Sequence, residues 1–138
     1  MTRIVVAAVI IDPSTSTLLL AQRSSPPEDA GLWELPGGKV EDGETWQAAL
    51  EREIVEELGM RVEAGEQVGE VVTGIPGFEV VALRARQTGG TPRALEHADL
   101  RWVDVAELRR MNEAGVLMAS SVAWLDELIG LLSNWADG

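Results

Sequence analysis

The chain contains no cysteine and a single histidine among its 138 residues. Without cysteine it can form no disulfide, carry no thiolate nucleophile and hold no cysteine-ligated zinc or iron–sulfur centre. A single histidine also excludes a multi-histidine metal site within one chain. Any metal ion that the chain binds must therefore be held by oxygen ligands.

Positive charge is scarce as well. The sequence has 11 lysines and arginines against 23 aspartates and glutamates, a formal net charge of −12. Such a chain is a poor partner for polymeric nucleic acid, whose backbone is bound by clustered basic side chains. A small phosphorylated substrate remains compatible with this charge. It would arrive partly neutralised by Mg²⁺ and would meet local cations such as Arg23 and Lys39.

The sequence also lacks an apolar run near the length of a membrane span, and its N-terminus lacks the pattern of a signal peptide. We therefore expect a soluble, cytoplasmic protein. At 138 residues and 46% hydrophobic content, the chain has the size and composition of one globular domain spanning residues 1–138. Whether it is a monomer or a homodimer is left open by the sequence.

The most uneven charge distribution lies in residues 38–60, which contain seven acidic residues against two basic ones. Glycine-rich turns open this stretch, and a helix is expected to begin after Gly43, with Thr45 as its N-cap, and to end at Gly59. Aliphatic residues recur every fourth position along it and predict the buried stripe of that helix: Leu50, Ile54 and Leu58.

Glu53, Glu56 and Glu57 share a second face of the predicted helix at i, i+3 and i+4. Like charges at this spacing repel, so the arrangement opposes folding unless a cation neutralises it. A hard divalent ion, Mg²⁺ or Mn²⁺, suits clustered carboxylates beside a backbone carbonyl. The alternative is an ordinary solvated acidic helix face.

The same stretch resembles the Nudix box, G-x5-E-x7-R-E-U-x-E-E-x-G-U, in which U is aliphatic. Nine fixed positions across 23 residues are filled, by Gly38, Glu44, Arg52, Glu53, Ile54, Glu56, Glu57, Gly59 and Met60. The preceding GLWELPGGK resembles the G-x-W-E-x-P-G-G-K sequence of the MutT-type branch of that family.

This resemblance implies an oxygen-ligated metal site. Its ligands would be Glu53, Glu56 and Glu57 with the backbone carbonyl of Gly37, and the metal would be Mg²⁺, with Mn²⁺ possible. Arg52 and Glu44 would pair across the junction of loop and helix and orient the carboxylates. The expected catalytic group consists of these two residues together with Glu53 and Glu56.

A second acidic candidate lies in EHADLRW, which resembles a MutT-type loop whose glutamate reaches the metal site. Glu96 is therefore a candidate metal ligand or general base, with an exposed loop acid as the alternative. The neighbouring His97 is expected on the surface, in a family whose chemistry uses carboxylates.

The resemblance also implies a set of nucleotide contacts. Arg23 matches a position that touches the nucleotide in MutT-type relatives, with a plain salt bridge as the alternative. The remaining expected contacts are Glu34, Leu35, Pro36, Gly37, Gly38, Lys39, Phe78 and Ser121. Ser121 stands where those relatives have asparagine or aspartate, so base discrimination is expected to be weaker or different. The likeness is closest to enzymes that cleave CTP and dCTP.

The pattern as a whole predicts an α+β protein. Strands are expected in residues 3–11, 18–23, 31–36, 62–73, 78–87 and 100–103. Asp104 can cap a helical turn, and residues 116–135 predict one amphipathic helix that carries Val122, Leu125, Ile129 and Leu132. The resemblance implies the Nudix fold, a mixed β-sheet sandwiched between α-helices.

The expected activity is Mg-dependent hydrolysis of canonical or modified nucleoside triphosphates to the monophosphate and pyrophosphate, in the manner of nucleotide pool sanitation. Two alternatives remain. One is hydrolysis of a nucleoside diphosphate linked to another group, such as an ADP-sugar or a dinucleotide. The other is a catalytically silent nucleotide-binding module of the same fold.

Overall fold

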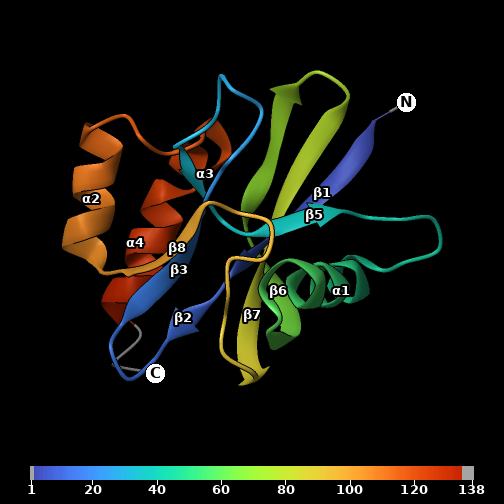
Figure 1. Ribbon diagram of the computed structural model, residues 1–138, viewed down its shortest axis with the longest axis horizontal. Coiled ribbons are helices and arrows are strands. Elements are labelled where there is room, and N and C mark those ends of the chain that lie inside the picture. The colour runs from blue at the N-terminus through green and yellow to red at the C-terminus, as the bar shows by residue number, and fades with distance from the viewer. Residues whose placement is uncertain (1, 135–138) are drawn as a thin grey trace.

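The computed structural model describes residues 2–134. Within that range the chain forms eight strands and four helices. In chain order (Figure 1) they are β1 (Arg3–Val9), β2 (Ile11–Asp12), β3 (Thr17–Gln22), β4 (Trp33–Glu34), β5 (Gly37–Lys39), α1 (Trp46–Leu58), β6 (Arg61–Ile75), β7 (Phe78–Gly89), β8 (Asp99–Val103), α2 (Val105–Glu113), α3 (Ala119–Ala123) and α4 (Leu125–Asn134).

The strands form two sheets. The first has the order β5-β1-β7-β6 and is mixed, because β1 and β7 run parallel whereas β5 and β6 are antiparallel to their neighbours. The second is antiparallel and places β3 between β2, β4 and β8. Helix α1 lies beside the first sheet, and α2, α3 and α4 lie on the opposite side of the molecule (Figure 1). This is the α+β arrangement with a mixed sheet that the sequence predicts.

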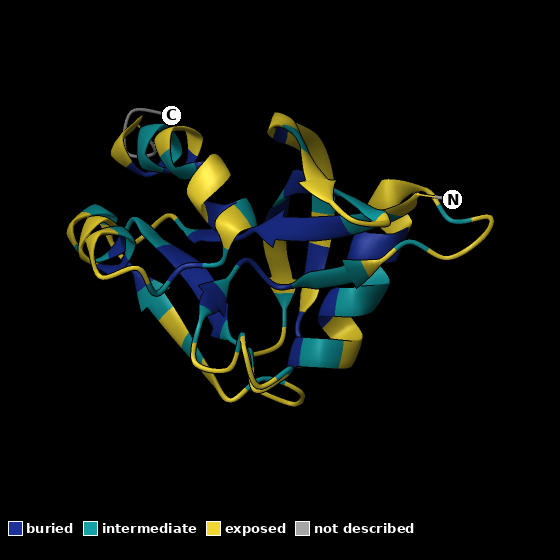
Figure 2. Cartoon of the chain, turned by 90° about the horizontal axis from the view of Figure 1, so that it is seen from above, coloured by how far each residue is buried: buried dark blue, intermediate teal, exposed yellow. Residues whose placement is uncertain are grey.

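β1 is covered on both faces, which explains its unbroken apolar sequence. Successive side chains of a strand point to opposite faces of its sheet. Val6 and Ala8 pack in the core beneath α1, whereas Ala7 and Val9 pack in the core that includes residues of α2 and α4. Buried strands accordingly run through the centre of the molecule (Figure 2).

Helix α1 begins and ends as predicted. The Thr45 hydroxyl accepts a hydrogen bond from the amide of Ala48 at 3.1 Å, and the chain leaves the helix at Gly59 with φ of 64°. The aliphatic stripe, Leu50, Ile54 and Leu58, is fully buried. Burying three such side chains stabilises the fold by roughly 1.5–3 kcal/mol each. The glutamates of α1 are thereby directed away from the core.

Residues 37–39 form a strand instead of the loop that their glycines suggest. β5 pairs antiparallel with β1, so that Gly37 lies opposite Ala7 and Gly38 lies opposite Val6. Gly37 permits close approach to β1 and Gly38 permits close approach to Glu53 of α1. The sequence pattern does not distinguish these tertiary requirements from a turn.

The prediction of a single helix over residues 116–135 is also wrong, because this stretch forms two separate helices, α3 and α4. Trp124 leaves the helical conformation between them, is 2% exposed and donates its indole N–H to the carbonyl of Glu70 at 2.8 Å. Val122 consequently faces solvent, and Trp135 lies outside the described residues. Across residues 2–134, none of the helices combines the length and apolarity needed to cross a membrane.

Candidate active site

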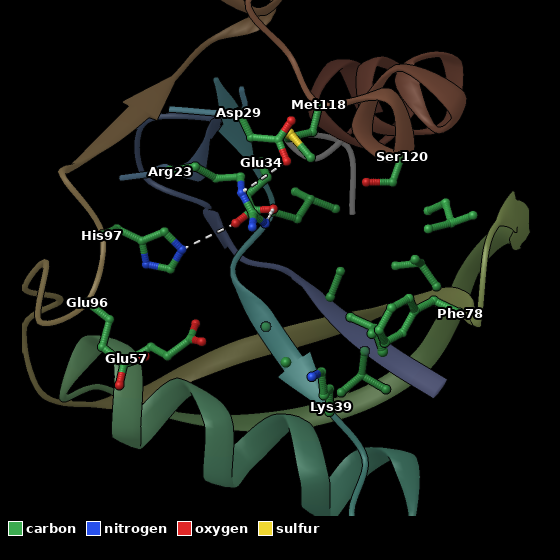
Figure 3. A pocket seen from close by; sticks show the side chains of 18 of the residues that line it. Arg23, Asp29, Glu34, Lys39, Glu57, Phe78, Glu96, His97, Met118 and Ser120 are labelled. Carbon is green, nitrogen blue, oxygen red and sulfur yellow. Dashed lines mark hydrogen bonds and ion pairs between the residues drawn. The ribbon is translucent and has the colours of Figure 1, made fainter. Parts of the chain in front are cut away.

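A pocket of about 640 Å³ opens where the first sheet meets the end of α1 and the start of α3. Its walls come from β1, the loop after β3, β4, β5, the β6–β7 hairpin and the loop before β8. The lining residues that bear on its chemistry (Figure 3) are Arg23, Asp29, Glu34, Gly37, Gly38, Lys39, Glu57, Phe78, Glu96, His97, Met118 and Ser120. Segments far apart in the sequence therefore meet around one cavity.

The floor beside α1 is built from glycine because no side chain fits there. A Cβ atom at Gly37 would collide with the carbonyl oxygen of Val6, and one at Gly38 would collide with the carboxylate of Glu53. The Glu53 carboxylate thus lies directly against the backbone of β5. The expected juxtaposition of the glycine segment and the glutamate helix is present.

Arg52 joins the loop to the helix, and its pairing with Glu44 is present as expected. Its Nε and Nη2 donate to the two carboxylate oxygens of Glu44, each at 2.8 Å. Nη1 donates to Glu53 at 3.0 Å and to Glu56 at 3.2 Å, and Nη2 also reaches the carbonyl of Lys39 at 3.1 Å. The hydrogen bonds from Arg52 lower the pKa of Glu44 to about 2. The same hydrogen bonds, which the Glu44 carboxylate accepts, raise the pKa of Arg52.

The three glutamates expected to bind the metal, Glu53, Glu56 and Glu57, have different environments. Burial raises the pKa of Glu57 to about 7, and Oε2 of this residue is buried with no hydrogen-bond partner among the described residues. Burial also raises the pKa of Glu53, while its contact with Arg52 works in the opposite direction. The Glu56 side chain is 55% exposed. Glu57 therefore lacks a hydrogen-bonded cation, although the charge of the nearby His97 works against the effect of burial on its pKa.

The expectation of three convergent carboxylates needs a correction. Within residues 2–134, no three acidic or histidine side chains are gathered closely enough to hold one ion. Glu53 and Glu56 instead share Arg52. The donor chemistry nevertheless fits a hard divalent cation, because the available groups are carboxylates and one oxygen of Glu57 has no hydrogen-bond partner among the described residues.

A second cluster of charged side chains in the pocket is centred on Glu34 of β4. Arg23 Nη1 donates to Glu34 Oε1 at 3.1 Å, and His97 Nε2 lies 3.3 Å from Glu34 Oε2. The His97 side chain is 10% exposed, so its predicted surface position is wrong. The hydrogen bond to Glu34 raises the pKa of His97 despite the opposing effect of burial. Arg23 forms an ion pair and also lines the pocket, so its expected contact with the nucleotide stays a prediction.

Glu34 is among the expected nucleotide contacts, but no sequence pattern pointed to the ion pairs that its carboxylate forms. The available signal was the position of Glu34 between the buried Trp33 and Leu35, because alternation in a strand places its carboxylate on the other face. Its partner His97 is 63 residues away in sequence. No local pattern indicates that contact.

The other end of the pocket is more apolar. Phe78 begins β7, and Lys39 Nζ lies 5.6 Å from the centroid of its ring. Both predicted contacts therefore line the cavity together. Glu96 lines it too, although the residue as a whole is exposed.

Ser121 is not where the resemblance placed it. It is 1% exposed and belongs to the interior, whereas the neighbouring Ser120 and Met118 line the pocket. Adjacent residues of a helix point about 100° apart, so a shift of one position exchanges an interior side chain for a pocket side chain. Pro36 does not line the pocket either, but its carbonyl accepts from the amide of Ala8 at 2.7 Å and so holds β5 against β1.

Comparison with known proteins gives a consistent picture. The family model of the NUDIX domain matches residues 1–125. The putative 8-oxo-dGTP diphosphatase 2 of Mycobacterium tuberculosis (strain ATCC 25618 / H37Rv) is 48% identical over 137 residues, covering 97% of this chain and 93% of the relative. The CTP pyrophosphohydrolase of Escherichia coli (strain K12) is 40% identical over 105 residues, covering 75% of this chain and 76% of the relative.

Solved structures show the same similarity. The solution structure of the E. coli ORF135 protein superposes with a TM-score of 0.74 at 34% identity, covering 94% of this chain and 90% of the other. The crystal structure of a MutT NUDIX hydrolase from Burkholderia pseudomallei gives a TM-score of 0.73 at 32% identity, covering 92% and 98%. Both similarities extend beyond the glutamate helix to nearly the whole chain.

Proposed function

The chain belongs to the Nudix family as a hydrolase that acts on nucleotides, and from this premise we propose that it cleaves nucleoside triphosphates to the monophosphate and pyrophosphate with Mg²⁺. The observation that carries the proposal is the unpaired, buried carboxylate oxygen of Glu57 on the pocket wall. Burial disfavours the charged form of this carboxylate, and a bound cation would offset that cost. A metal-bound polyphosphate would bring one.

The names of two relatives support the triphosphate. One is named for 8-oxo-dGTP and the other for CTP, so the two names differ in the base and agree in the triphosphate. The pocket is also of the size that small-molecule ligands occupy, at about 640 Å³. We take the triphosphate chain as the shared substrate feature and leave the base to a substrate panel.

Glu53, Glu56 and Glu57 would hold the ion together only after their side chains turn toward one another, because as they lie here they are not gathered closely enough; the backbone carbonyl of Gly37 would be the further protein ligand. When bound, a divalent ion neutralises charge on the phosphate oxygens and lowers the pKa of water. Because the carboxylates stand on one helix, a single rigid element would carry most of the metal site.

Side chains of the protein orient the metal-binding carboxylates and accept the proton of the attacking water. Arg52, held by both oxygens of Glu44, positions Glu53 and Glu56 through its hydrogen bonds. A water oxygen attacks the α- or the β-phosphorus in line, and the bond from that phosphorus to the α–β bridging oxygen breaks, so that the other half of the triphosphate leaves with the bond electrons. Glu53 or Glu96 takes the proton of the water. Glu53 has the stronger case, because burial raises its pKa and so strengthens it as a base.

The test is a pyrophosphate-release assay on a panel of CTP, dCTP, UTP, ATP, dGTP and 8-oxo-dGTP with Mg²⁺. We expect release from at least one triphosphate, loss of release with EDTA, and recovery on adding excess Mg²⁺. Glu57→Gln should lose most of the rate, whereas Glu63→Gln removes an exposed charge outside the pocket and should retain it. If no triphosphate in the panel releases pyrophosphate, the proposal is wrong.

A further inference from the structure

His97 is a largely buried polar residue that has no role in the reaction proposed above. Its side chain is 10% exposed and lines the pocket. Nδ1 is buried and has no hydrogen-bond partner among the described residues. Buried polar atoms in folded proteins are nearly always paired, so an unpaired ring nitrogen at a pocket wall points to a partner that binds there.

The orientation of the ring is determined by Glu34. The Glu34 carboxylate accepts from Arg23 Nη1 at 3.1 Å through Oε1, which leaves Oε2 to accept from His97 at 3.3 Å. A carboxylate accepts and does not donate, so Nε2 of the ring carries the hydrogen of this contact. Nδ1 is consequently the nitrogen available to a ligand, and it donates a hydrogen bond there when the ring is the doubly protonated imidazolium, because Nε2 already carries one hydrogen.

The backbone on both sides of His97 is anchored. The amides of Arg93 and Leu95 donate to the last carbonyls of α1, at Leu58 (2.9 Å) and Glu57 (3.2 Å), and the amide of Ala98 donates to the carbonyl of Gln22 in β3 at 2.9 Å. The imidazole is therefore held in place before any ligand arrives. Such preorganisation reduces the entropy that a contact costs on binding.

The position of His97 also indicates which part of a nucleotide it would meet. In Figure 3 the ring lies at the end of the pocket that holds Glu57 and Glu96, away from Phe78 and Lys39. The glutamate end is where the proposed reaction places the phosphates. Oxygens of a polyphosphate chain accept hydrogen bonds, and an N–H that faces them is the complementary group.

We propose that His97 is a substrate-binding residue of this pocket, and that its Nδ1 donates a hydrogen bond to a phosphoryl oxygen of the nucleotide. The inference rests on the proposed function and adds a specific phosphate contact to it. The bound ring would stand between two anionic acceptors, Glu34 on Nε2 and the phosphoryl oxygen on Nδ1. Glu34 would act as a positioning residue that connects Arg23 to this contact.

Two substitutions separate binding from a purely structural role. Glutamine at residue 97 places its amide near the position of Nε2. His97→Gln can therefore keep the contact with Glu34 but has no hydrogen-bond donor at the position of Nδ1. Asparagine places its amide near Nδ1, so His97→Asn keeps a donor toward the pocket and loses the contact with Glu34. Far-UV circular dichroism and thermal unfolding verify that each variant is folded.

We expect His97→Gln to raise KM for the best triphosphate roughly tenfold, the effect of losing one hydrogen bond to a charged group, with kcat within about threefold of wild type. His97→Asn should raise KM less. The inhibition constant of the corresponding nucleoside, which has no phosphate, should not change. Two results would overturn the proposal: a His97→Gln variant with wild-type KM, or a nucleoside inhibition constant that rises as much as KM.

The wild-type protein provides a test that needs no variant and no turnover. Because the chain has one histidine, untagged protein labelled with ¹⁵N gives a single set of imidazole signals. A non-hydrolysable triphosphate analogue should shift the Nδ1 signal and slow exchange of its proton, whereas the nucleoside should leave both unchanged. An Nδ1 signal that stays in place at saturation contradicts the phosphate contact. Failure of pyrophosphate release with an Nδ1 response would instead count against the proposed function alone.

Discussion

Arg52 and Glu44 meet in a two-pronged ion pair, with Nε to Oε2 and Nη2 to Oε1 both at 2.8 Å. This geometry uses the planar fork of a guanidinium, which an ammonium group cannot reproduce. The third nitrogen of the fork then holds Glu53 and Glu56. One arginine thus transmits the position of the loop to the carboxylates of α1.

Arg52→Lys should therefore impair catalysis more than folding. Lysine keeps the charge but loses the simultaneous contacts, and loss of a residue that orients metal-site carboxylates lowers activity roughly 10- to 100-fold. The measurement is kcat for pyrophosphate release at saturating Mg²⁺. Arg86→Lys is the matched control, because Arg86 is 69% exposed and pairs only with the exposed Glu63 among the contacts described. Equal rates in both variants would contradict the positioning role.

Gly38→Ala should damage the site through a collision. The added methyl group would meet the Glu53 carboxylate, which must then move away from β5. We expect a fall in kcat with little change in the free energy of unfolding, because only the end of a flexible side chain has to move. Gly65→Ala is the control, since its Cβ would approach nothing closer than the Arg84 carbonyl oxygen at 3.8 Å. Urea unfolding and the pyrophosphate assay on both variants test this, and wild-type behaviour of Gly38→Ala would refute it.

Glu57 should make the metal-free protein less stable as pH rises. The folded state holds the Glu57 proton up to a pKa of about 7, whereas the unfolded chain releases it near the ordinary value of 4.5. Between these values the unfolded state binds fewer protons, so the free energy of unfolding falls with rising pH. After allowance for solvent screening, we expect this contribution to be on the order of 1–2 kcal/mol between pH 5 and 8.

The measurement is urea unfolding at pH 5 and pH 8 in buffer treated with chelator. Glu57→Gln should lose this part of the pH dependence and be more stable than wild type at pH 8. Glu63→Gln, which removes an exposed charge, should retain the wild-type dependence. A pH dependence that is identical in wild type and Glu57→Gln would show that Glu57 is not the group responsible.

Phe78→Leu should weaken substrate binding and leave the chemical step intact. The ring lines the pocket away from the glutamates, beside Lys39 at 5.6 Å, so its loss removes an aromatic surface and a cation–π contact. We expect KM to rise about threefold to tenfold with kcat little changed. Val122→Leu alters an exposed side chain of α3 outside the pocket and serves as the control. A fall in kcat at constant KM would contradict this assignment.

Structural features that depend only on residues close together in the sequence were predictable. Thr45 and Gly59 bound α1 because a hydroxyl cap and a left-handed residue act within one helical turn. The pairing of Arg52 with Glu44 follows from a motif contained in 23 residues. Periodicity failed at Trp124, where an indole hydrogen bond to Glu70, 54 positions away, interrupts the helical pattern.

The sequence by itself determined the family resemblance, the glutamate helix with its buried stripe, and the class of reaction. Only the tertiary structure decided which side chains face the pocket: Ser120 instead of Ser121, and Glu34 with His97 across 63 residues. The physical reason is the range of the interactions. Caps, stripes and helix faces depend on residues a few positions apart, whereas a pocket wall depends on how separate strands and loops pack, which no local spacing records.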